Sequence, residues 1–146
     1  MQLIELLKTA DKDEYIYLGA ASMYLYIAKP EEMIEKLPEL DDYYTRKLQH
    51  QIKQKTTMID YYERCLQRVQ SKFELKETNH QLEKAKRIKR EATEKLENRI
   101  PFAARQVKDV YRRKLVEPFG FCVIIEGGEY GDFWTYDEVE EYNGKQ

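Results

Sequence analysis

The sequence predicts an α+β fold: a small acidic head with a short antiparallel sheet and short helices, interrupted by a long α-helical coiled-coil hairpin arm. Three observations support this prediction. No glycine or proline lies between Pro38 and Pro101, β-prone runs lie near both ends, and charged residues make up 36% of the 146 residues. Because few of these charges can enter a core, part of the chain is expected to be an elongated, solvated helix. We assign residues 1–42 and 101–146 to the head and residues 43–100 to the arm.

The N-terminal part of the head is expected to contain a short helix, a pair of strands and a second short helix. The run MQLIELLKT has the apolar spacing of an amphipathic helix. YIYLGA and SMYLYIA, residues 15–20 and 22–28, are β-prone and predict a hairpin. Pro30 then begins a short helix, PEEMIEKL, in which proline suits the first position and the glutamates suit the helix dipole.

The arm carries a heptad pattern of the kind found in coiled coils. One apolar column recurs every seven positions from Ile52 to Phe73, and a companion column offset by four contains the polar Lys55. Such columns bury themselves against another helix, so they also predict self-association. The residues expected at this seam are Ile52, Ile59, Tyr62, Leu66, Val69 and Phe73.

The heptad register breaks after Phe73, which favours a turn near residues 76–80. Thr78 and Gln81 have the spacing of a capping box, in which each side chain satisfies a free backbone N–H at a helix start. Folding the chain back here would place large residues opposite small ones, as packed helices prefer. The alternative is one unbroken helix, about twice as long, which would need a partner chain.

The C-terminal part of the head contains one clear strand. FGFCVIIE, residues 119–126, is a strong strand candidate, whereas residues 106–112 fit either a strand or a short helix. Thr135 and Glu138 form a second capping box, which predicts a last helix through Tyr142. The glycines between strand and helix are expected to supply positive φ in a turn. A phosphate-binding loop is disfavoured because acidic residues crowd these glycines and no Lys-Ser or Lys-Thr follows them.

Charge is segregated along the chain, and the basic section is a candidate contact surface. Residues 84–116 carry twelve Lys and Arg against four Asp and Glu, whereas both ends are acidic. One interpretation is a solvated helix face whose basic residues pair with Glu91, Glu94 and Glu97. The other is an electrostatic footprint for nucleic acid or for an acidic protein surface. The basic residues concerned are Lys84, Lys86, Arg87, Lys89, Arg90, Lys95 and Arg99.

The acidic ends offer a second candidate surface. Residues 1–42 and 117–146 together carry eighteen Asp and Glu against five Lys and Arg. Carboxylates can take the place of phosphates in a nucleic-acid groove of another protein, with aromatic side chains as anchors. The alternative is ordinary surface acidity, with Phe133 and Trp134 in the core of the head. The residues of the expected contact are Glu126, Glu129, Tyr130, Asp132, Phe133, Trp134 and Tyr136.

No residue pattern predicts catalysis, a metal site or a cofactor. His50 and His80 lack companions at metal-ligand spacing, and Cys65 and Cys122 have no identifiable basic partner. No apolar run approaches the length of a membrane span, and the N-terminus does not read as a signal peptide. We therefore expect a non-enzymatic cytoplasmic protein with no cofactor and no membrane partner.

Two stretches carry a resemblance to known proteins: LIELLKTADKDEYIYL at the start and VIIEGGEYGDFWTYDEVEEY at the finish. They resemble small, mostly uncharacterised accessory proteins encoded by phages and prophages of Gram-positive bacteria. The turn with Gly, Asp, an aromatic residue, Trp and Thr is the most distinctive part. The resemblance implies a product that acts in the bacterial host cytoplasm by binding host machinery, CRISPR-type defence enzymes included, without chemistry of its own.

Three functions follow as expectations. The leading one is a phage-type accessory protein that binds and inhibits a host protein or protein–nucleic acid complex, such as a nucleic-acid-processing or defence enzyme. The first alternative is direct nucleic-acid binding by the basic helix at residues 84–99. The second alternative is a structural protein that assembles into homo-oligomers through the coiled coil.

Overall fold

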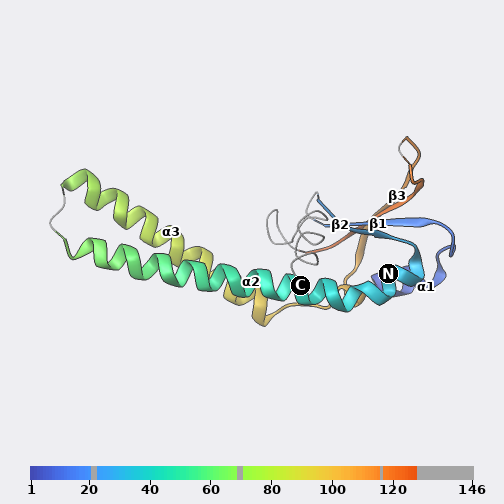
Figure 1. Cartoon of the computed structure of the whole chain (residues 1–146), viewed down its shortest axis with the longest axis horizontal. Coiled ribbons are helices and arrows are strands. Elements are labelled where there is room, and N and C mark those ends of the chain that lie inside the picture. Colours follow the sequence, from blue (N-terminus) through green and yellow to red (C-terminus); the bar gives the residue numbers. More distant parts are fainter. Residues whose placement is uncertain (21–22, 69–70, 116, 128–146) are drawn as a thin grey trace. The chain divides into compact units, whose positions relative to one another are not determined.

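The computed structural model describes residues 1–20, 23–68, 71–115 and 117–127, and these form an α+β structure (Figure 1). The described residues contain a four-stranded sheet, three α-helices and one 3-10 turn. The predicted α+β class is therefore confirmed. The chain divides into two compact units. The sheet unit comprises Met1–Tyr44 and Ile100–Gln146, and the helical unit comprises Thr45–Arg99.

The elements are distributed between the two units. Helix α2 (Pro30–Leu66) begins in the sheet unit and ends in the helical unit, and α3 (Lys72–Glu97) lies wholly in the helical unit. The remaining elements belong to the sheet unit: α1 (Leu3–Thr9), β1 (Tyr15–Ala20), β2 (Met23–Ala28), η1 (Phe102–Ala104), β3 (Val107–Arg113) and β4 (Gly120–Ile125).

The sheet has the strand order β2-β1-β4-β3, with β1 and β4 at its centre. The pairs β1–β2 and β3–β4 are antiparallel, but the central pair β1–β4 is parallel, so the sheet is mixed and the predicted antiparallel sheet was wrong in this respect. The expected N-terminal strand pair and the strand near residue 120 are confirmed. The segment that fitted either a strand or a helix is the strand β3, which combines β-prone valines and a tyrosine with charged residues, as suits a sheet edge.

The core of the sheet unit lies between the sheet and α2. The parallel register places Leu18 of β1 beside Val123 of β4, and both side chains are fully buried. Tyr26 of β2 pairs with Leu18 on the same face, and the Lys36 ammonium of α2 lies 5.0 Å from the centre of the Tyr26 ring. Met33, on the same helix, is also fully buried. The apolar stripe of α2 is therefore buried against this face of the sheet.

Helix α2 is much longer than the short helix expected after Pro30, so that prediction was wrong. The helix continues through Pro38 to Leu66. Proline removes one helical hydrogen bond at a cost of about 3 kcal/mol, but Pro38 is exposed, where water can reach the orphaned carbonyl. Full burial of each large apolar side chain contributes about 1.5–3 kcal/mol. Such residues lie at helical spacing on both sides of the proline, and their burial outweighs its cost: Met33 and Leu37 before it, and Leu40, Tyr44 and Leu48 after it.

The helical unit has one helix ending at Leu66 and the next beginning at Lys72, which corrects the predicted turn near residues 76–80. Because α2 ends at Leu66 and α3 begins at Lys72, the chain does not form one unbroken helix either. The Ser71 hydroxyl caps α3 by accepting a hydrogen bond from the Glu74 N–H at 3.2 Å. Thr78 instead donates its hydroxyl to the Glu74 carbonyl at 2.8 Å, inside the helix. The predicted capping box was therefore wrong because Thr78 has a helical partner and Ser71 already begins the helix.

Few side chains are buried in the helical unit. Leu48 of α2 and Leu82, Ala85 and Ala92 of α3 are buried. Phe73 was expected in the heptad seam but lies in the first turn of α3, where it is 74% exposed. The helix break precedes Phe73, so the apolar column of α2 cannot continue through it.

The chain beyond β4 turns at a glycine, as the sequence predicts. Gly127 has a φ of 95°, a conformation that side-chain-bearing residues rarely adopt. The last predicted helix, residues 135–142, lies outside the described residues. Within the described ranges, no helix combines the length and the apolar character needed to cross a membrane.

Candidate functional site

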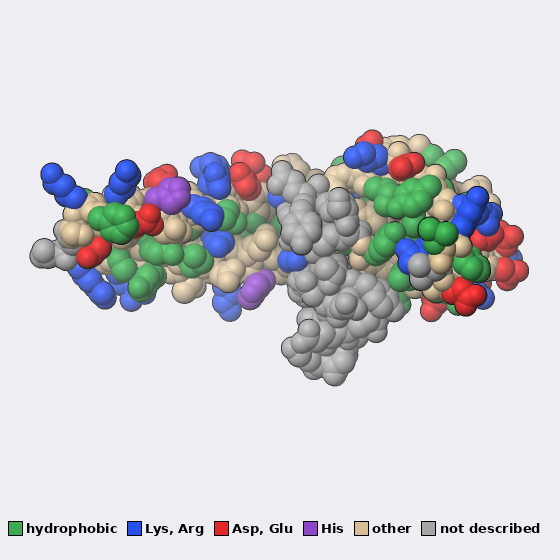
Figure 2. All heavy atoms as spheres, turned by 90° about the horizontal axis from the view of Figure 1, so that it is seen from above, with side chains coloured by type: hydrophobic (Ala, Val, Ile, Leu, Met, Phe, Trp, Pro, Cys, Tyr) green, Lys and Arg blue, Asp and Glu red, His purple; other side chains and the backbone are tan. Residues whose placement is uncertain are grey.

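The two units carry opposite net charge. The helical unit has fifteen Lys and Arg against eight Asp and Glu, whereas the sheet unit has ten against nineteen. Figure 2 shows Lys and Arg side chains projecting along the helical unit, with fewer acidic side chains between them. By net charge, a large anionic ligand is therefore drawn to the helical unit, although the sheet unit has a local basic stretch at residues 107–114.

Three of the predicted basic residues meet at one pocket. Lys86, Lys89 and Arg90 lie three and four positions apart, which places them on one side of α3. An apolar wall gives their aliphatic stems a surface to pack on while the charged ends stay in water. The pocket is open, has a volume of about 420 Å³ and is called the α3 basic pocket below; it is lined by Ile59 of α2 and by Lys86, Lys89, Arg90, Thr93 and Glu94 of α3.

The cations of the α3 basic pocket have no acidic partner in the described part of the chain. Lys86, Lys89 and Arg90 form no ion pair there, although Glu94 lines the same pocket. On α2, by contrast, the Arg64 guanidinium lies 2.8 Å from the Asp60 carboxylate. Unpaired guanidinium and ammonium groups keep all their donors available for a bound anion.

The other predicted basic residues do not line this pocket. Lys84 precedes Lys86 by two positions, a rotation of about 200° around the helix axis, so it lies on a different side of α3. Arg87 is exposed, Lys95 is half-buried, and the Arg99 Nη1 donates a hydrogen bond to the Leu96 carbonyl at 2.6 Å. The basic section is therefore divided between different sides of the helix, and one group of three is gathered around a hollow.

Most of the predicted acidic contact lies outside the described residues. Glu126 is described and exposed, directly after β4, and its N–H donates a hydrogen bond to the Gln106 carbonyl at 2.8 Å. The acidic contact stays a prediction. Its other members, all outside the described ranges, are Glu129, Tyr130, Asp132, Phe133, Trp134 and Tyr136.

The predicted self-association seam is only partly buried within one chain. Four of its residues on α2 are half-buried, Phe73 is exposed and Val69 lies outside the described residues. Ile59 has a local role, since it lines the α3 basic pocket. Whether the seam contacts a second copy stays a prediction. The four half-buried residues are Ile52, Ile59, Tyr62 and Leu66.

The sequence analysis missed a polar cluster on the sheet face opposite α2. The Arg113 guanidinium lies 4.4 Å from the centre of the Tyr17 ring, and its Nη1 donates to the Tyr24 hydroxyl at 3.4 Å. The Tyr24 hydroxyl also lies 3.3 Å from the Cys122 sulfur. Hydrogen bonding to Tyr24 and then to Cys122 raises the pKa of Tyr111 above its ordinary value. Strand alternation suggests which residues share a face, but the parallel pairing of β1 with β4 has no local sequence signal.

Comparison with known proteins gives no relative for the chain. No protein-family model, curated protein or solved structure matches it. Any function must therefore be argued from the residues of this chain.

Proposed function

We propose that the protein is a non-enzymatic binding protein that holds the phosphate backbone of a nucleic acid in the α3 basic pocket. The observation that carries this proposal is the group of three unpaired cations, Lys86, Lys89 and Arg90, around one open hollow. Nucleic acids are dense polyanions, and Lys and Arg contacts to phosphate dominate their affinity for proteins. This ligand is a nucleic acid, free or within a protein–nucleic acid complex.

The lining of the α3 basic pocket favours a backbone contact over base recognition. Lys86, Lys89 and Arg90 can donate to phosphate oxygens, whereas the Thr93 hydroxyl already donates to the Lys89 carbonyl at 2.8 Å. No aromatic side chain lines this pocket among the described residues, and stacking on aromatic rings is how proteins usually hold unpaired bases. We therefore expect a preference for duplexes and little dependence on sequence.

The arrangement of α2 and α3 supports a coiled-coil hairpin arm that presents the pocket. Ile59 of α2 and Arg90 of α3 line one hollow, and small buried residues such as Ala85 and Ala92 allow two helices to approach closely. The sheet unit acts as an acidic head in this proposal. Its excess of carboxylates repels a polyanion and confines the nucleic acid to the arm.

The biological role that we propose for this binding is that of a phage-type accessory protein. Occupying the nucleic acid of a host processing or defence complex would inhibit that complex without any chemistry by the inhibitor. The acidic head would then be free to contact a host protein in the bacterial cytoplasm.

The proposal is tested by fluorescence anisotropy with labelled duplex DNA, duplex RNA and single-stranded DNA over a range of salt concentrations. Three phosphate contacts predict that log K falls with log salt at a slope of about −2.7 on duplex DNA. The triple variant Lys86→Glu, Lys89→Glu, Arg90→Glu should remove this binding. An absence of binding by the unaltered protein at low salt would refute the proposal.

A matched control distinguishes the contribution of the α3 basic pocket to affinity from that of the net charge of the helix. The variant Lys76→Glu, Lys84→Glu, Arg87→Glu changes the net charge equally on α3, at exposed positions that do not line the pocket. We expect this control to lose only the general electrostatic part of the affinity. Equal losses in the two triple variants would show that the helix attracts the nucleic acid without a defined site.

A further inference from the structure

Strand β3 forms an edge of the sheet, and its outer side is open along most of its length. β4 is its only partner strand in the described residues. The central residues of β3, from Lys108 to Arg112, are exposed. An open edge presents unpaired N–H and C=O groups, which an extended peptide can pair with.

The beginning of this edge already accepts an extended segment from the same chain. The Val107 N–H donates to the Met1 carbonyl at 2.9 Å, and the Leu3 N–H donates to the Arg105 carbonyl at 2.9 Å. These bonds form an antiparallel bridge between Gln2 and Gln106. The N-terminal residues therefore occupy the first part of the outer edge, and a strand in line with them would continue along β3.

The hydrogen bonds identify which backbone groups remain available. The Gln106 carbonyl accepts from the Glu126 N–H, so alternation along β4 directs residues 124, 122 and 120 towards β3. Their partners on β3 are residues 109, 111 and 113, which leaves the backbones of Val110 and Arg112 facing outwards. The Val110 N–H accordingly donates to the Asp109 carboxylate at 2.9 Å and not to a neighbouring strand.

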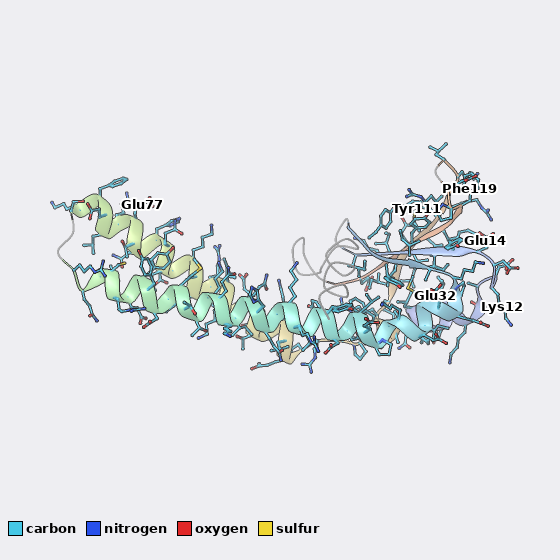
Figure 3. The ribbon with its side chains drawn as sticks, in the orientation of Figure 1. Lys12, Glu14, Glu32, Glu77, Tyr111 and Phe119 are labelled. Atoms are coloured by element: carbon cyan, nitrogen blue, oxygen red, sulfur yellow. The ribbon has the colours of Figure 1, made fainter. Side chains whose placement is uncertain are left out.

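The side chains around the open edge are basic and apolar. Residues 107–114 carry four Lys and Arg against one Asp, and Lys108 and Lys114 form no ion pair with any described residue. Figure 3 shows Tyr111, which belongs to β3, and Phe119, which directly precedes β4. Four large apolar side chains beside the edge are 43–96% exposed: Val110, Tyr111, Leu115 and Phe119.

We propose that the outer edge of β3 binds an extended acidic segment of another protein by strand addition. The backbone groups of Val110 and Arg112 would pair with the incoming strand, whose carbonyl would replace the Asp109 carboxylate on the Val110 N–H. Acidic side chains of the segment would meet Lys108 and Lys114, and its apolar side chains, which alternate with them, would cover Tyr111 on the other face of the sheet. This site lies in the sheet unit and is independent of the α3 basic pocket.

A second copy of this chain fits the edge poorly. An antiparallel pair of β3 strands centred on Val110 would place Lys108 of each copy opposite Arg112 of the other, and like charges directly opposite are destabilising. An acidic strand reverses the sign of these contacts. Charge complementarity therefore selects the acidic segment.

The test is an NMR titration with a capped peptide of alternating Glu and Val, compared with the same peptide in which Lys replaces Glu. We expect the acidic peptide alone to bind and to slow hydrogen exchange at the Val110 and Arg112 amides. Val110→Pro removes an outward N–H without removing a bond to β4, so the sheet tolerates it. It should weaken binding about tenfold, the equivalent of one lost hydrogen bond, whereas Val110→Thr should bind normally.

A second variant and two further outcomes complete the test. Lys108→Glu with Lys114→Glu should also lose the peptide, whereas the α3 triple variant should retain it. No binding of the acidic peptide, or unchanged binding by Val110→Pro, would overturn the proposal. A concentration-dependent dimer that Val110→Pro abolishes would assign the edge to a second copy and would overturn it as well.

Discussion

Phe102 in the sheet unit is 1% exposed, whereas Phe73 in the helical unit is 74% exposed. Phe102 packs beside Tyr44, with ring centres 6.2 Å apart, and its N–H donates to the Asp41 carboxylate at 2.8 Å. Phe73 projects from the first turn of α3. The sheet unit thus depends on a shared core, while the helical unit depends on local helix bonds and a few buried residues. A unit of the second kind leaves most of its side chains free for a partner.

The largest expected effect is the loss of the Phe102 ring. Phe102→Ala removes a fully buried aromatic side chain, leaves a cavity and should lower the free energy of unfolding by about 3–5 kcal/mol. Urea denaturation followed by circular dichroism measures this change. Phe73→Ala is the matched control and should change the free energy by no more than about 0.5 kcal/mol. Similar losses in the two variants would show that the units do not differ as described.

The next largest effect concerns the residue that caps the start of α3. Ser71→Ala removes the hydroxyl that caps α3 and should lower stability by about 1 kcal/mol. Hydrogen exchange at the first amides of α3 should quicken in this variant. Ser71→Asp retains an acceptor and should restore protection. Thr78→Ala should leave these amides unaffected, and a larger effect from Thr78 than from Ser71 would return the helix start to the position first predicted.

The smallest effect concerns the polar face of the sheet. The pKa of Tyr111 is raised in the folded protein by hydrogen bonding to Tyr24 and Cys122, so folding favours its neutral form. The stability that it contributes is complete below about pH 10, the unfolded pKa, and is lost as the pH rises further. Because Tyr111 is half exposed and water screens its polar contacts, Tyr111→Phe should cost less than about 0.5 kcal/mol at neutral pH and progressively less above pH 10.

Chemical denaturation across this pH range measures the Tyr111 contribution. Tyr61→Phe serves as the control, since Tyr61 is exposed on α2 of the helical unit. A difference between the protein and Tyr111→Phe that stays constant with pH would contradict the assigned hydrogen bonds.

The sequence was informative where one local pattern dominates and misleading where two compete. Short runs of β-prone and apolar residues identified β1, β2 and β4, and the span without Gly or Pro identified the helices. Pro38 was misread as a boundary because the buried stripe that overrides it depends on contact with the sheet. Ser71 and Thr78 both have hydroxyls that can cap a helix, so composition alone could not decide between them.

The candidate sites show the same division. The basic residues of α3 were visible in the sequence. Which of them line a pocket could not be predicted, because this depends on where Ile59 of α2 lies beside α3. The open edge of β3 could not be anticipated, because strand order depends on a parallel pairing between residues about a hundred positions apart, such as Leu18 and Val123.

The bridge between Met1–Leu3 and residues 105–107 has a practical consequence for preparing this protein. An affinity tag fused before Met1 would begin in line with the free margin of β3 and could lie along it, hiding the surface on which a partner would be sought. Purification tags and fluorophores are better attached elsewhere. Slower hydrogen exchange at the Val110 amide in a tagged protein would itself show that an extended peptide can add to β3.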